Sequence, residues 1–446
     1  MSGEPRLNPV VRWAFYLLVC SIPFEFPDRS FPVEIPTLTA SLFLFATLLD
    51  PRACYARKPA ALLCFVAYLY AYWLSAALNG RDHVATELIT PDYWDQVVKQ
   101  FLLIVQGVIV LWAGYNLMRT EKIGRETMAV FALACVARAM LPILGIARTA
   151  RTEWGGGERI TALGQNANNS AMILGAGLIA LLALQYGLER PFVRRRWLLW
   201  PAFGLLGVSV VNTGSRGGLV ALGLGLVVFA IGRAHSTWIR VRNAAVTALA
   251  IGVLVYATYA NSLMRARFAE ALERGALAGR ERIYPALMHM AAERPLVGWG
   301  PVNNKYELGI RLDERIRRRR DAHNLILEVL TATGALGVVP FLLGLGLCAR
   351  GAWQARRRAH GVLAVALLAG VMLANMSGNW IASKLLWLVL TYGLASATYP
   401  LAVRQVPARA GPPVPEPLPK GRRRPALVRM PSTVSTRPRP EAGANL

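Results

Sequence analysis

Three positions far apart in the chain place an arginine or a histidine beside a glycine or at the edge of an apolar segment. Arg216 lies in the glycine-rich stretch 212–218, between two apolar runs. Arg280 follows Gly279, and His323 stands at the start of another apolar run. Guanidinium groups bind anions through parallel hydrogen bonds, and a neutral imidazole accepts a proton. These side chains could therefore bind an anionic group and act as a base, and ionisable residues at membrane depth are candidates for function.

Two further cations lie at the edges of apolar runs, and each has a structural interpretation beside the functional one. Lys99 begins an apolar run, where it could bind substrate or extend its ammonium group to the membrane interface. Arg159 precedes an asparagine-rich segment and could bind substrate, or it could pair with Glu158 or a phospholipid. Arg216 could be a topological anchor, but outward anchors are seldom arginine, which favours a functional role.

His323 is the best candidate for a general base among the five histidines. It follows a basic segment, and we expect it in the first turn of a membrane helix. The N-terminus of a helix and neighbouring arginines both disfavour the protonated imidazole, so a neutral base would remain available. The other histidines have no converging partners in the sequence and are expected to be structural or exposed: His83, His235, His289 and His360.

The elements that must position these residues are membrane helices. The chain has 446 residues, of which 54% are hydrophobic and 17% charged, whereas a soluble protein has about 25% charged residues. A span needs about 20 apolar residues, and lipid offers no partner for unpaired backbone groups. We therefore predict an all-α polytopic membrane protein with about twelve transmembrane helices. The predicted spans are residues 9–26, 34–50, 60–78, 98–117, 127–147, 166–187, 197–212, 217–232, 243–260, 323–347, 362–380 and 384–402.

The loops between the apolar runs determine the predicted orientation. Every second loop is rich in arginine and lysine, for example at 194–196 and 356–358. Cation-rich loops stay in the cytoplasm, so both termini are predicted inside and the number of spans is even. We interpret the first apolar run as a retained helix rather than a signal peptide, because no clear small-residue cleavage site follows it.

The formal net charge of +25 raises the question of a nucleic-acid partner. The cations lie mostly in short loops between apolar runs, so they indicate topology, and we expect no nucleic acid. The five cysteines lie in or beside apolar runs without CxxC spacing and predict neither a disulfide framework nor a metal site. We expect no metal and no cofactor.

One predicted outward loop, residues 261–322, is long and carries more cations than acids. Loops of about 60 residues can cross the membrane whatever their charge, so the predicted orientation holds. The excess charge favours an anionic substrate outside the cytoplasm. The run Arg317–Arg320 is predicted to form a solvated or headgroup-facing lip.

Residues 403–446, rich in Pro and Arg, are predicted to form a disordered cytoplasmic tail beyond a membrane domain at 1–402. The tail either contacts anionic membrane lipids or stays solvated and enforces topology.

Several short motifs occur in a particular order along the chain. They are Ser215-Arg216-Gly217-Gly218, Gly279-Arg280 followed by Ile283-Tyr284, Arg294-Pro295-Leu296-Val297-Gly298-Trp299-Gly300, and His323-Asn324 before Gly334 and Gly337. The ordered set resembles the O-antigen ligase and O-antigen polymerase superfamily of bacterial inner-membrane glycosyltransferases. Arg159 before Asn166 and Asn168 is similar to the family's Arg…Asn pattern, and Tyr284 stands where the family often has Trp. The resemblance covers roughly residues 95–350.

The resemblance implies transfer of a glycan from an undecaprenyl-diphosphate carrier to an acceptor on the periplasmic side. The acceptor is lipid A–core in ligases and another carrier-linked unit in polymerases. Cations are needed where the diphosphate leaves, which suits Arg216 and Arg280, and the acceptor hydroxyl needs a base, which suits His323. The substrate-binding candidates are Lys99, Arg159, Arg282 and Asn324.

Four functions remain to be weighed at this point. Ligase is preferred over polymerase, although both would show these motifs. A flippase or other transporter for lipid-linked oligosaccharides would also need cations, but it would more often show internal repeats or broken helices and needs no base. A membrane scaffold would not explain the set Arg216, Arg280 and His323.

Overall fold

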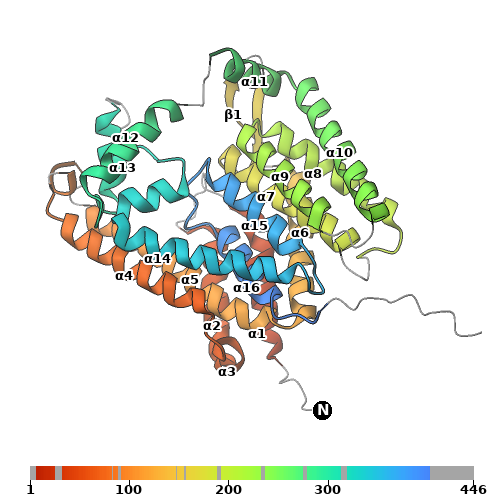
Figure 1. Cartoon of the computed structure of the whole chain (residues 1–446), viewed down its shortest axis with the longest axis horizontal. Coiled ribbons are helices and arrows are strands. Elements are labelled where there is room, and N and C mark those ends of the chain that lie inside the picture. The colour runs from red at the N-terminus through yellow and green to blue at the C-terminus, as the bar shows by residue number, and fades with distance from the viewer. Residues whose placement is uncertain are drawn as a thin grey trace, which may run out of the picture. The chain divides into compact units, whose positions relative to one another are not determined.

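The computed structural model describes ten stretches of the chain, most of them helical (Figure 1). The described stretches are residues 7–25, 33–82, 84–88, 92–146, 148–154, 157–187, 192–232, 237–274, 279–312 and 319–401. The predicted tail at 403–446 lies outside the described residues, as do Arg317 and Arg318 of the predicted lip.

The described elements follow one another as helices, interrupted by one pair of strands. The longer helices are α1 (Pro9–Ser21), α2 (Ile35–Ala46), α4 (Ala60–Asn79), α5 (Tyr93–Met118), α6 (Glu121–Ile143), α7 (Ala167–Leu182), α8 (Trp200–Asn212), α9 (Arg216–Gly232), α10 (Thr237–Ala260), α11 (Ser262–Arg274), α12 (Arg280–Glu293), α13 (Asn303–Arg311), α14 (Leu325–Ala355), α15 (Leu363–Asn375) and α16 (Lys384–Ser396). The strands are β1 (Arg148–Trp154) and β2 (Gly157–Ala162). Short helical turns are α3 (Pro51–Tyr55) and the segments Ile22–Phe24, Thr47–Leu49, Val84–Leu88, Ala183–Gly187 and Arg196–Leu199.

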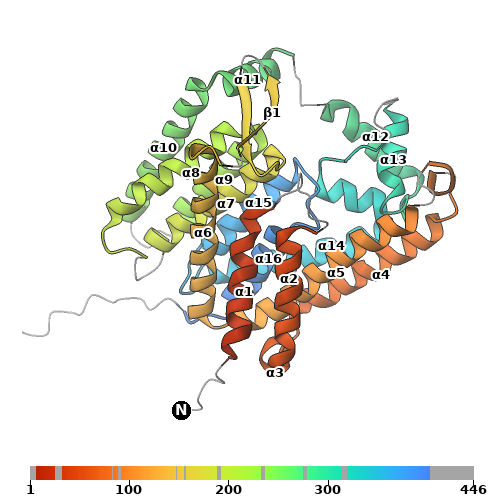
Figure 2. The same cartoon turned by 180° about the vertical axis from the view of Figure 1, so that it is seen from behind.

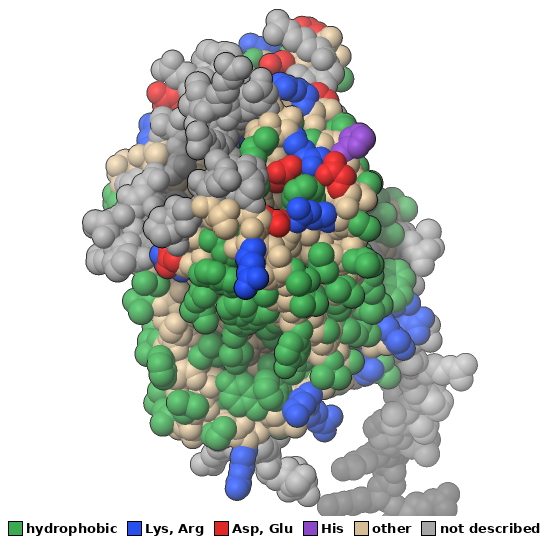
Figure 3. All heavy atoms as spheres, turned by 90° about the vertical axis from the view of Figure 1, so that its left-hand side faces the viewer, with side chains coloured by type: hydrophobic (Ala, Val, Ile, Leu, Met, Phe, Trp, Pro, Cys, Tyr) green, Lys and Arg blue, Asp and Glu red, His purple; other side chains and the backbone are tan. Residues whose placement is uncertain are grey.

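Many of these helices are suited to a membrane. Within the described stretches, five helices are long and apolar enough to cross one: α4, α5, α6, α7 extended to Tyr186, and α14. The number rises to six if α10 and α11, which meet at 93°, form one broken span, and six further apolar helices are shorter. Each predicted span thus contains a helix, while twelve crossings remain a prediction. On the face shown in Figure 3, hydrophobic side chains form a broad band, with charged groups mostly above and below it.

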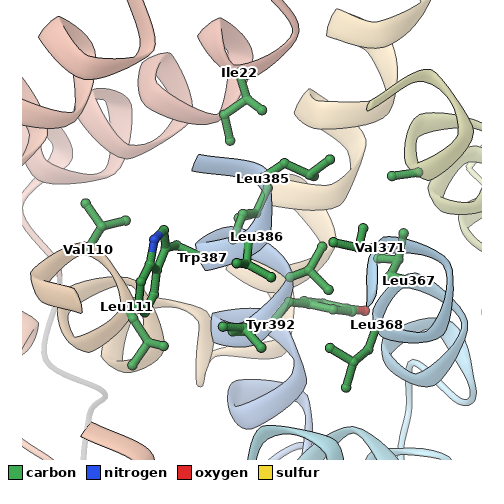
Figure 4. Close-up of a cluster of buried hydrophobic side chains, with 14 of the residues drawn as sticks. Ile22, Val110, Leu111, Leu367, Leu368, Val371, Leu385, Leu386, Trp387 and Tyr392 are labelled. Atoms are coloured by element: carbon green, nitrogen blue, oxygen red, sulfur yellow. The ribbon is translucent and has the colours of Figure 1, made fainter. Parts of the chain in front are cut away.

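The core of the helical unit is built around α16. Figure 4 shows Trp387 and Tyr392 of α16 among leucine and valine side chains of α5 and α15. Both aromatic side chains are fully buried, and the Trp387 indole nitrogen donates to the Ile381 carbonyl at 2.8 Å. A side chain on Gly107 of α5 would overlap the Trp387 ring. This glycine therefore lets α5 approach α16 closely, as small residues do between membrane helices.

A β-hairpin is an addition to the predicted all-helical architecture. Strands β1 and β2 pair antiparallel from Arg148–Ala162 to Trp154–Gly157. Threonines and an isoleucine in these strands favour the extended backbone, because β-branched side chains suit a pleated surface. Figures 1 and 2 show the hairpin at the same end of the molecule as α11, α12 and α13, whereas α1 begins at the opposite end.

Helix α14 is broken at Gly334, which has φ 59° and ψ −159°. The break is filled by the backbone of residues 294–300, so groups that leave the helical ladder find partners. These bonds are Trp299 N to Thr331 O (2.8 Å), Gly300 N to Ala332 O (3.0 Å), Ala335 N to Pro295 O (2.7 Å) and Leu336 N to Leu296 O (3.1 Å). A side chain on Gly334 would overlap the Leu296 backbone, and one on Gly298 would lie 2.7 Å from the Ala332 carbonyl carbon. We call this arrangement the α14 clasp.

Helix α4 holds the other side of the clasp. The Ser75 hydroxyl lies 2.6 Å from the Val297 carbonyl and 2.7 Å from that of Ala332. The Arg294 guanidinium lies 3.9 Å from the centroid of the Trp299 ring and pairs with Asp82 at 2.5 Å. The 294–300 motif is therefore accounted for by structure, since its arginine and glycines hold the break in α14 against α4.

Candidate active site

The turn that carries Arg216 is closed by its own side chains. Gly214 has φ 66°, a conformation that glycine adopts without strain. The Thr213 hydroxyl accepts from Ser215 N at 3.2 Å, and the Ser215 hydroxyl accepts from Gly218 N at 3.1 Å. The fixed turn makes Arg216 the first residue of α9.

Arg216 forms a hydrogen bond to the backbone of a second arginine, Arg267 on α11. Its Nη1 donates to the carbonyl of Arg267 at 2.6 Å. In return, Nη1 of Arg267 donates to the carbonyl of Gly214 at 2.7 Å. Helix α11 is thereby tied to the turn before α9 by two charge-assisted hydrogen bonds, which are stronger than neutral ones.

Arg159 reaches the same turn from the hairpin. Its Nε donates to the Thr213 carbonyl at 3.0 Å, and its Nη2 lies 3.5 Å from Oδ1 of Asn168. The same Asn168 oxygen accepts from the Ser215 hydroxyl at 2.8 Å. Burial, and the positive charge of Arg267, lower the pKa of Arg159 to about 10. The side chain is still a cation at pH 7, but it lies in a site with a surplus of positive charge.

Arg280 begins α12, after Gly279 with φ 84°. Its Nε is buried and has no hydrogen-bond partner among the residues the structure describes. The positive charge of Arg280 contributes to lowering the pKa of Arg267 and also that of His323. Arg280 therefore adds positive charge at both Arg267 and His323.

His323 is half-buried and has φ 50°, an uncommon conformation for a residue other than glycine. Burial lowers the pKa of its imidazole; the charges of Asp321 and Glu328 oppose this, and those of Arg320 and Arg280 add to it. The net effect keeps the imidazole neutral at pH 7. His323 lies two residues before α14 rather than in its first turn, so burial, and not the helix N-terminus, is the main cause.

Asn324 is the N-cap of α14. Its side-chain oxygen accepts from the backbone N–H groups of Ile326 at 3.0 Å and Leu327 at 3.1 Å. Asparagine is among the favoured residues at this position because it satisfies helix N–H groups that otherwise lack partners. The side chain is mostly buried, and its structural role accounts for it; substrate binding by Asn324 stays a prediction.

The remaining predicted residues lie on exposed surfaces. Lys99 lies in the second turn of α5, and its ammonium group pairs with Asp95 at 2.6 Å. Arg282 is exposed on α12. The contacts and charges described above join Arg159, Arg216, Arg267, Arg280 and His323, and the contacts described for Lys99 and Arg282 do not extend to that set.

The segment before His323 is held by an ionic network that the sequence did not indicate. Lys305 of α13 is buried and pairs with Asp321 at 3.0 Å and with Glu328 at 3.5 Å. Arg320 N donates to the Lys305 carbonyl at 2.9 Å. Arg320 of the predicted lip also approaches the site, since a Cβ on Gly279 would lie 3.7 Å from its Nη2.

Residues 201–342 match the sequence profile of the O-antigen ligase family. This region of the chain is similar to O-antigen ligases. The match confirms the superfamily predicted from the motifs and supports an enzyme of the ligase or polymerase type. No curated protein was found to match the chain. The O-antigen ligase region contains Arg216, Arg267, Arg280 and His323, whereas Arg159 lies before it.

Proposed function

We propose that the protein transfers a glycan from undecaprenyl diphosphate to lipid A–core on the periplasmic face of the bacterial inner membrane. The observation that carries the proposal is the group of cations at the turn before α9, where Arg216 donates to the Arg267 carbonyl and Arg159 donates to the Thr213 carbonyl. In the proposed site these cations bind the diphosphate, and the neutral imidazole of His323 serves the acceptor hydroxyl. The ligase-type family match supports lipid-linked glycan and acceptor substrates in general.

The arginines would stabilise the leaving group. Breaking the bond between the anomeric carbon and the diphosphate leaves negative charge on phosphate oxygens, and fixed donors at that place lower the barrier. Guanidinium groups suit this task because one fork binds two oxygens. Arg216 and Arg280 would contact the diphosphate, with Arg159 and Arg267 adding to the positive field. Four cations provide the charge that a metal ion provides in other glycosyl transfers, so we propose a metal-independent reaction.

His323 would activate the acceptor. Its neutral imidazole takes the proton from the acceptor hydroxyl as that oxygen bonds to the anomeric carbon. The carrier leaves as undecaprenyl diphosphate with the electron pair of the broken bond, and the protonated imidazole then loses its proton to water. The buried, arginine-rich surroundings favour the neutral imidazole both before and after this step.

The arrangement of the helices supports the proposed orientation. The hairpin and α11–α13, which carry or adjoin the site, lie at one end, and α1 begins at the other (Figures 1 and 2). An even number of crossings would then leave both termini in the cytoplasm and the site in the periplasm. The alternating cation-rich loops favour the same orientation.

Two alternatives remain, and the structure bears on one of them. A polymerase would use the same site with a second carrier-linked glycan as acceptor. A transporter would use a broken helix to line a substrate cavity. Helix α14 is broken at Gly334, but the break is filled by the backbone of residues 294–300. A clasp of this kind favours a fixed site over a moving gate.

One reconstitution separates the three functions. Purified protein in lipid nanodiscs is incubated with glycan-linked undecaprenyl diphosphate and with lipid A–core, and the products are identified by mass. Glycan joined to lipid A–core supports the ligase. Glycan joined to a second carrier identifies a polymerase. Movement of the intact glycan-linked carrier across a vesicle membrane, with no new glycosidic bond, would identify a transporter.

A further inference from the structure

Three consecutive residues at the start of α7 bind three different parts of the molecule. Asn168 contacts Ser215 and Arg159 of the site. The Asn169 amide donates to the Glu25 carboxylate, and the Ser170 hydroxyl accepts from Arg138 of α6. A residue of the arginine site is therefore followed directly by two that belong to another polar network.

Arg138 is the centre of this second network. Its side chain is 2% exposed, and its Nη2 donates to Gln165 Oε1 at 2.8 Å as well as to the Ser170 hydroxyl. The Gln165 amide donates in turn to the backbone carbonyls of Pro23 at 3.0 Å and Glu25 at 2.9 Å. One guanidinium nitrogen thus holds both Gln165 and Ser170, which flank Asn168 in the sequence.

A buried arginine in the C-terminal half of an apolar helix needs an explanation. Removing a cation from water is costly, and its hydrogen bonds only partly offset the cost. The Nε of Arg138 has no partner in the described part of the chain, so this compensation is incomplete. Packing alone would be served better by an apolar side chain of the same size, which indicates that the residue has a task beyond packing.

The space around Arg138 shows why the start of α7 needs a fixed anchor. A cavity of about 120 Å³ lies between α6, α7, α8 and the hairpin, and Arg138, Ser170 and Thr213 are among its lining residues. Packing beside Ser170 and Leu174 is therefore incomplete on this side, so hydrogen bonds add to what fixes the start of the helix. Thr213 also accepts the hydrogen bond of Arg159, so a shift of α7 into the cavity would disturb the site.

We propose that Arg138 is a positioning residue for the diphosphate site. By holding Gln165 and Ser170 it fixes Asn168, and Asn168 aligns Arg159 with the turn that carries Arg216. This inference rests on the proposed binding of a diphosphate by the arginines. The inference gives Arg138 a role in function although its side chain contacts neither the substrate nor His323.

The test combines the unbranched apolar variant Arg138→Met with Asn168→Ala. Each single variant is expected to weaken binding of undecaprenyl diphosphate, without glycan, by about tenfold, since residues coupled through a network interact by this order. If Arg138 acts through Asn168, the double variant is no weaker than the worse single variant. Binding is measured by native mass spectrometry and turnover by product mass, with thermal unfolding as the check on folding.

Two matched variants sharpen the comparison. Arg148→Gln changes another cation that lines the same cavity, but one that is half exposed and 3.9 Å from Glu158, so binding should be unchanged. Arg138→Met combined with His323→Ala should give independent losses in turnover that multiply, because His323 is not held by Asn168. If Arg138→Met fails to fold, Arg138→Lys is used in its place. Lysine keeps the charge, but its ammonium group on a side chain of different length cannot hold both Gln165 Oε1 and the Ser170 hydroxyl oxygen.

The outcomes separate the inference from the function on which it rests. A folded Arg138→Met protein that binds and turns over normally, or losses that multiply with Asn168→Ala, would overturn the positioning role alone. Unaltered protein that neither binds undecaprenyl diphosphate nor transfers glycan would overturn the proposed function, and the positioning role with it. Coupled losses with normal unfolding temperatures support the proposal.

Discussion

Arg216 and Arg267 hold each other in place through backbone carbonyls. The Nη1 of Arg216 lies 2.6 Å from the carbonyl of Arg267, and the Nη1 of Arg267 lies 2.7 Å from the carbonyl of Gly214. Each guanidinium therefore uses one donor to orient the other segment. The pair joins the turn before α9 to α11, and its charges add to those of Arg159 and Arg280.

The first prediction is that Arg267→Lys impairs transfer as severely as a change at Arg216. A lysine keeps the charge, but its single ammonium group lacks the rigid planar fork with which Arg267 holds the Gly214 carbonyl. Loss of one fixed donor in a site of this kind costs about 2.7–4 kcal/mol of barrier. The measurement is turnover of glycan-linked carrier. Arg265→Lys, two residues earlier on an exposed part of α11, is the matched control and should be near normal.

The second prediction separates the site arginines from the lip. Arg216→Lys and Arg280→Lys should each lower turnover at any salt concentration, because a point charge cannot replace a two-pronged contact. A glutamine variant of the lip residues Arg317–Arg319, which keeps Arg320 because Arg320 approaches the site, should instead weaken capture of the carrier at low salt and resemble the unaltered protein at high salt. Exposed charges are screened beyond about 8–10 Å. Normal turnover in both Lys variants, together with an inactive lip variant at every salt concentration, would show that the diphosphate binds at the lip instead.

The sequence predicted the cations that lie in motifs and missed one that does not. Arg216, Arg280 and His323 stand beside glycines or at the start of an apolar run, which are local signals. Arg267 has no such signal, because its importance comes from a partner 51 residues away in the chain. The excess of cations in the predicted loop was the available clue, and it does not single out one arginine.

Other differences also have physical causes. The arginine and glycines of the 294–300 motif suggest a functional role, but they serve the α14 clasp, where Gly298 and Gly334 have positive φ and no room for a side chain. The search for long apolar runs that predicts the spans cannot detect the hairpin, whose strands are short and mostly polar. Asn324 could have been predicted as a cap, since asparagine before an apolar run is a common helix start.

The third prediction concerns pH. The base must be neutral, and the pKa of His323 is lowered by burial. Transfer should therefore keep its full rate as the pH falls past the usual histidine value of 6.5, and it should be lost as the pH falls through the lowered pKa. His323→Ala should lower transfer by about 10²–10⁴ at neutral pH, the usual range for loss of a general base. The measurement is the pH profile of turnover.

Substitutions of two charged neighbours, Arg320 and Asp321, test the direction in which each shifts the pKa of His323. Arg320→Gln removes a positive charge that lowers the pKa of His323, so the acid limb should move to higher pH. Asp321→Asn removes a negative charge that raises the pKa, so the limb should move to lower pH. Because Asp321 also pairs with Lys305, its variant is compared by pH profile rather than by absolute rate. Profiles that move together in one direction would exclude His323 as the titrating base.

The fourth prediction concerns the α14 clasp. Gly334→Ala forces a side chain into a backbone conformation reserved for glycine and against the Leu296 backbone. Strain of this kind costs about 1–3 kcal/mol, so the unfolding temperature in detergent should fall. Gly346→Ala lies on the same helix, where an added Cβ meets nothing within 4 Å, and should leave the unfolding temperature unchanged or slightly raised. Equal behaviour of the two variants would show that the clasp does not stabilise the fold.

The last prediction concerns orientation. In a protein whose exposed Cys20 is replaced by serine, single cysteines at Arg195, Arg357 and His289 are treated in intact cells with a thiol reagent that cannot cross the inner membrane. His289 lies exposed on α12, in the predicted outward segment, so its cysteine should react. Asn303, in the same segment, is unsuitable because it is buried. Arg195 and Arg357 are exposed in cation-rich loops predicted to face the cytoplasm, so their cysteines should react only after the membrane is permeabilised. Labelling at Arg195 or Arg357 in intact cells, with none at His289, would invert the topology and place the site in the cytoplasm.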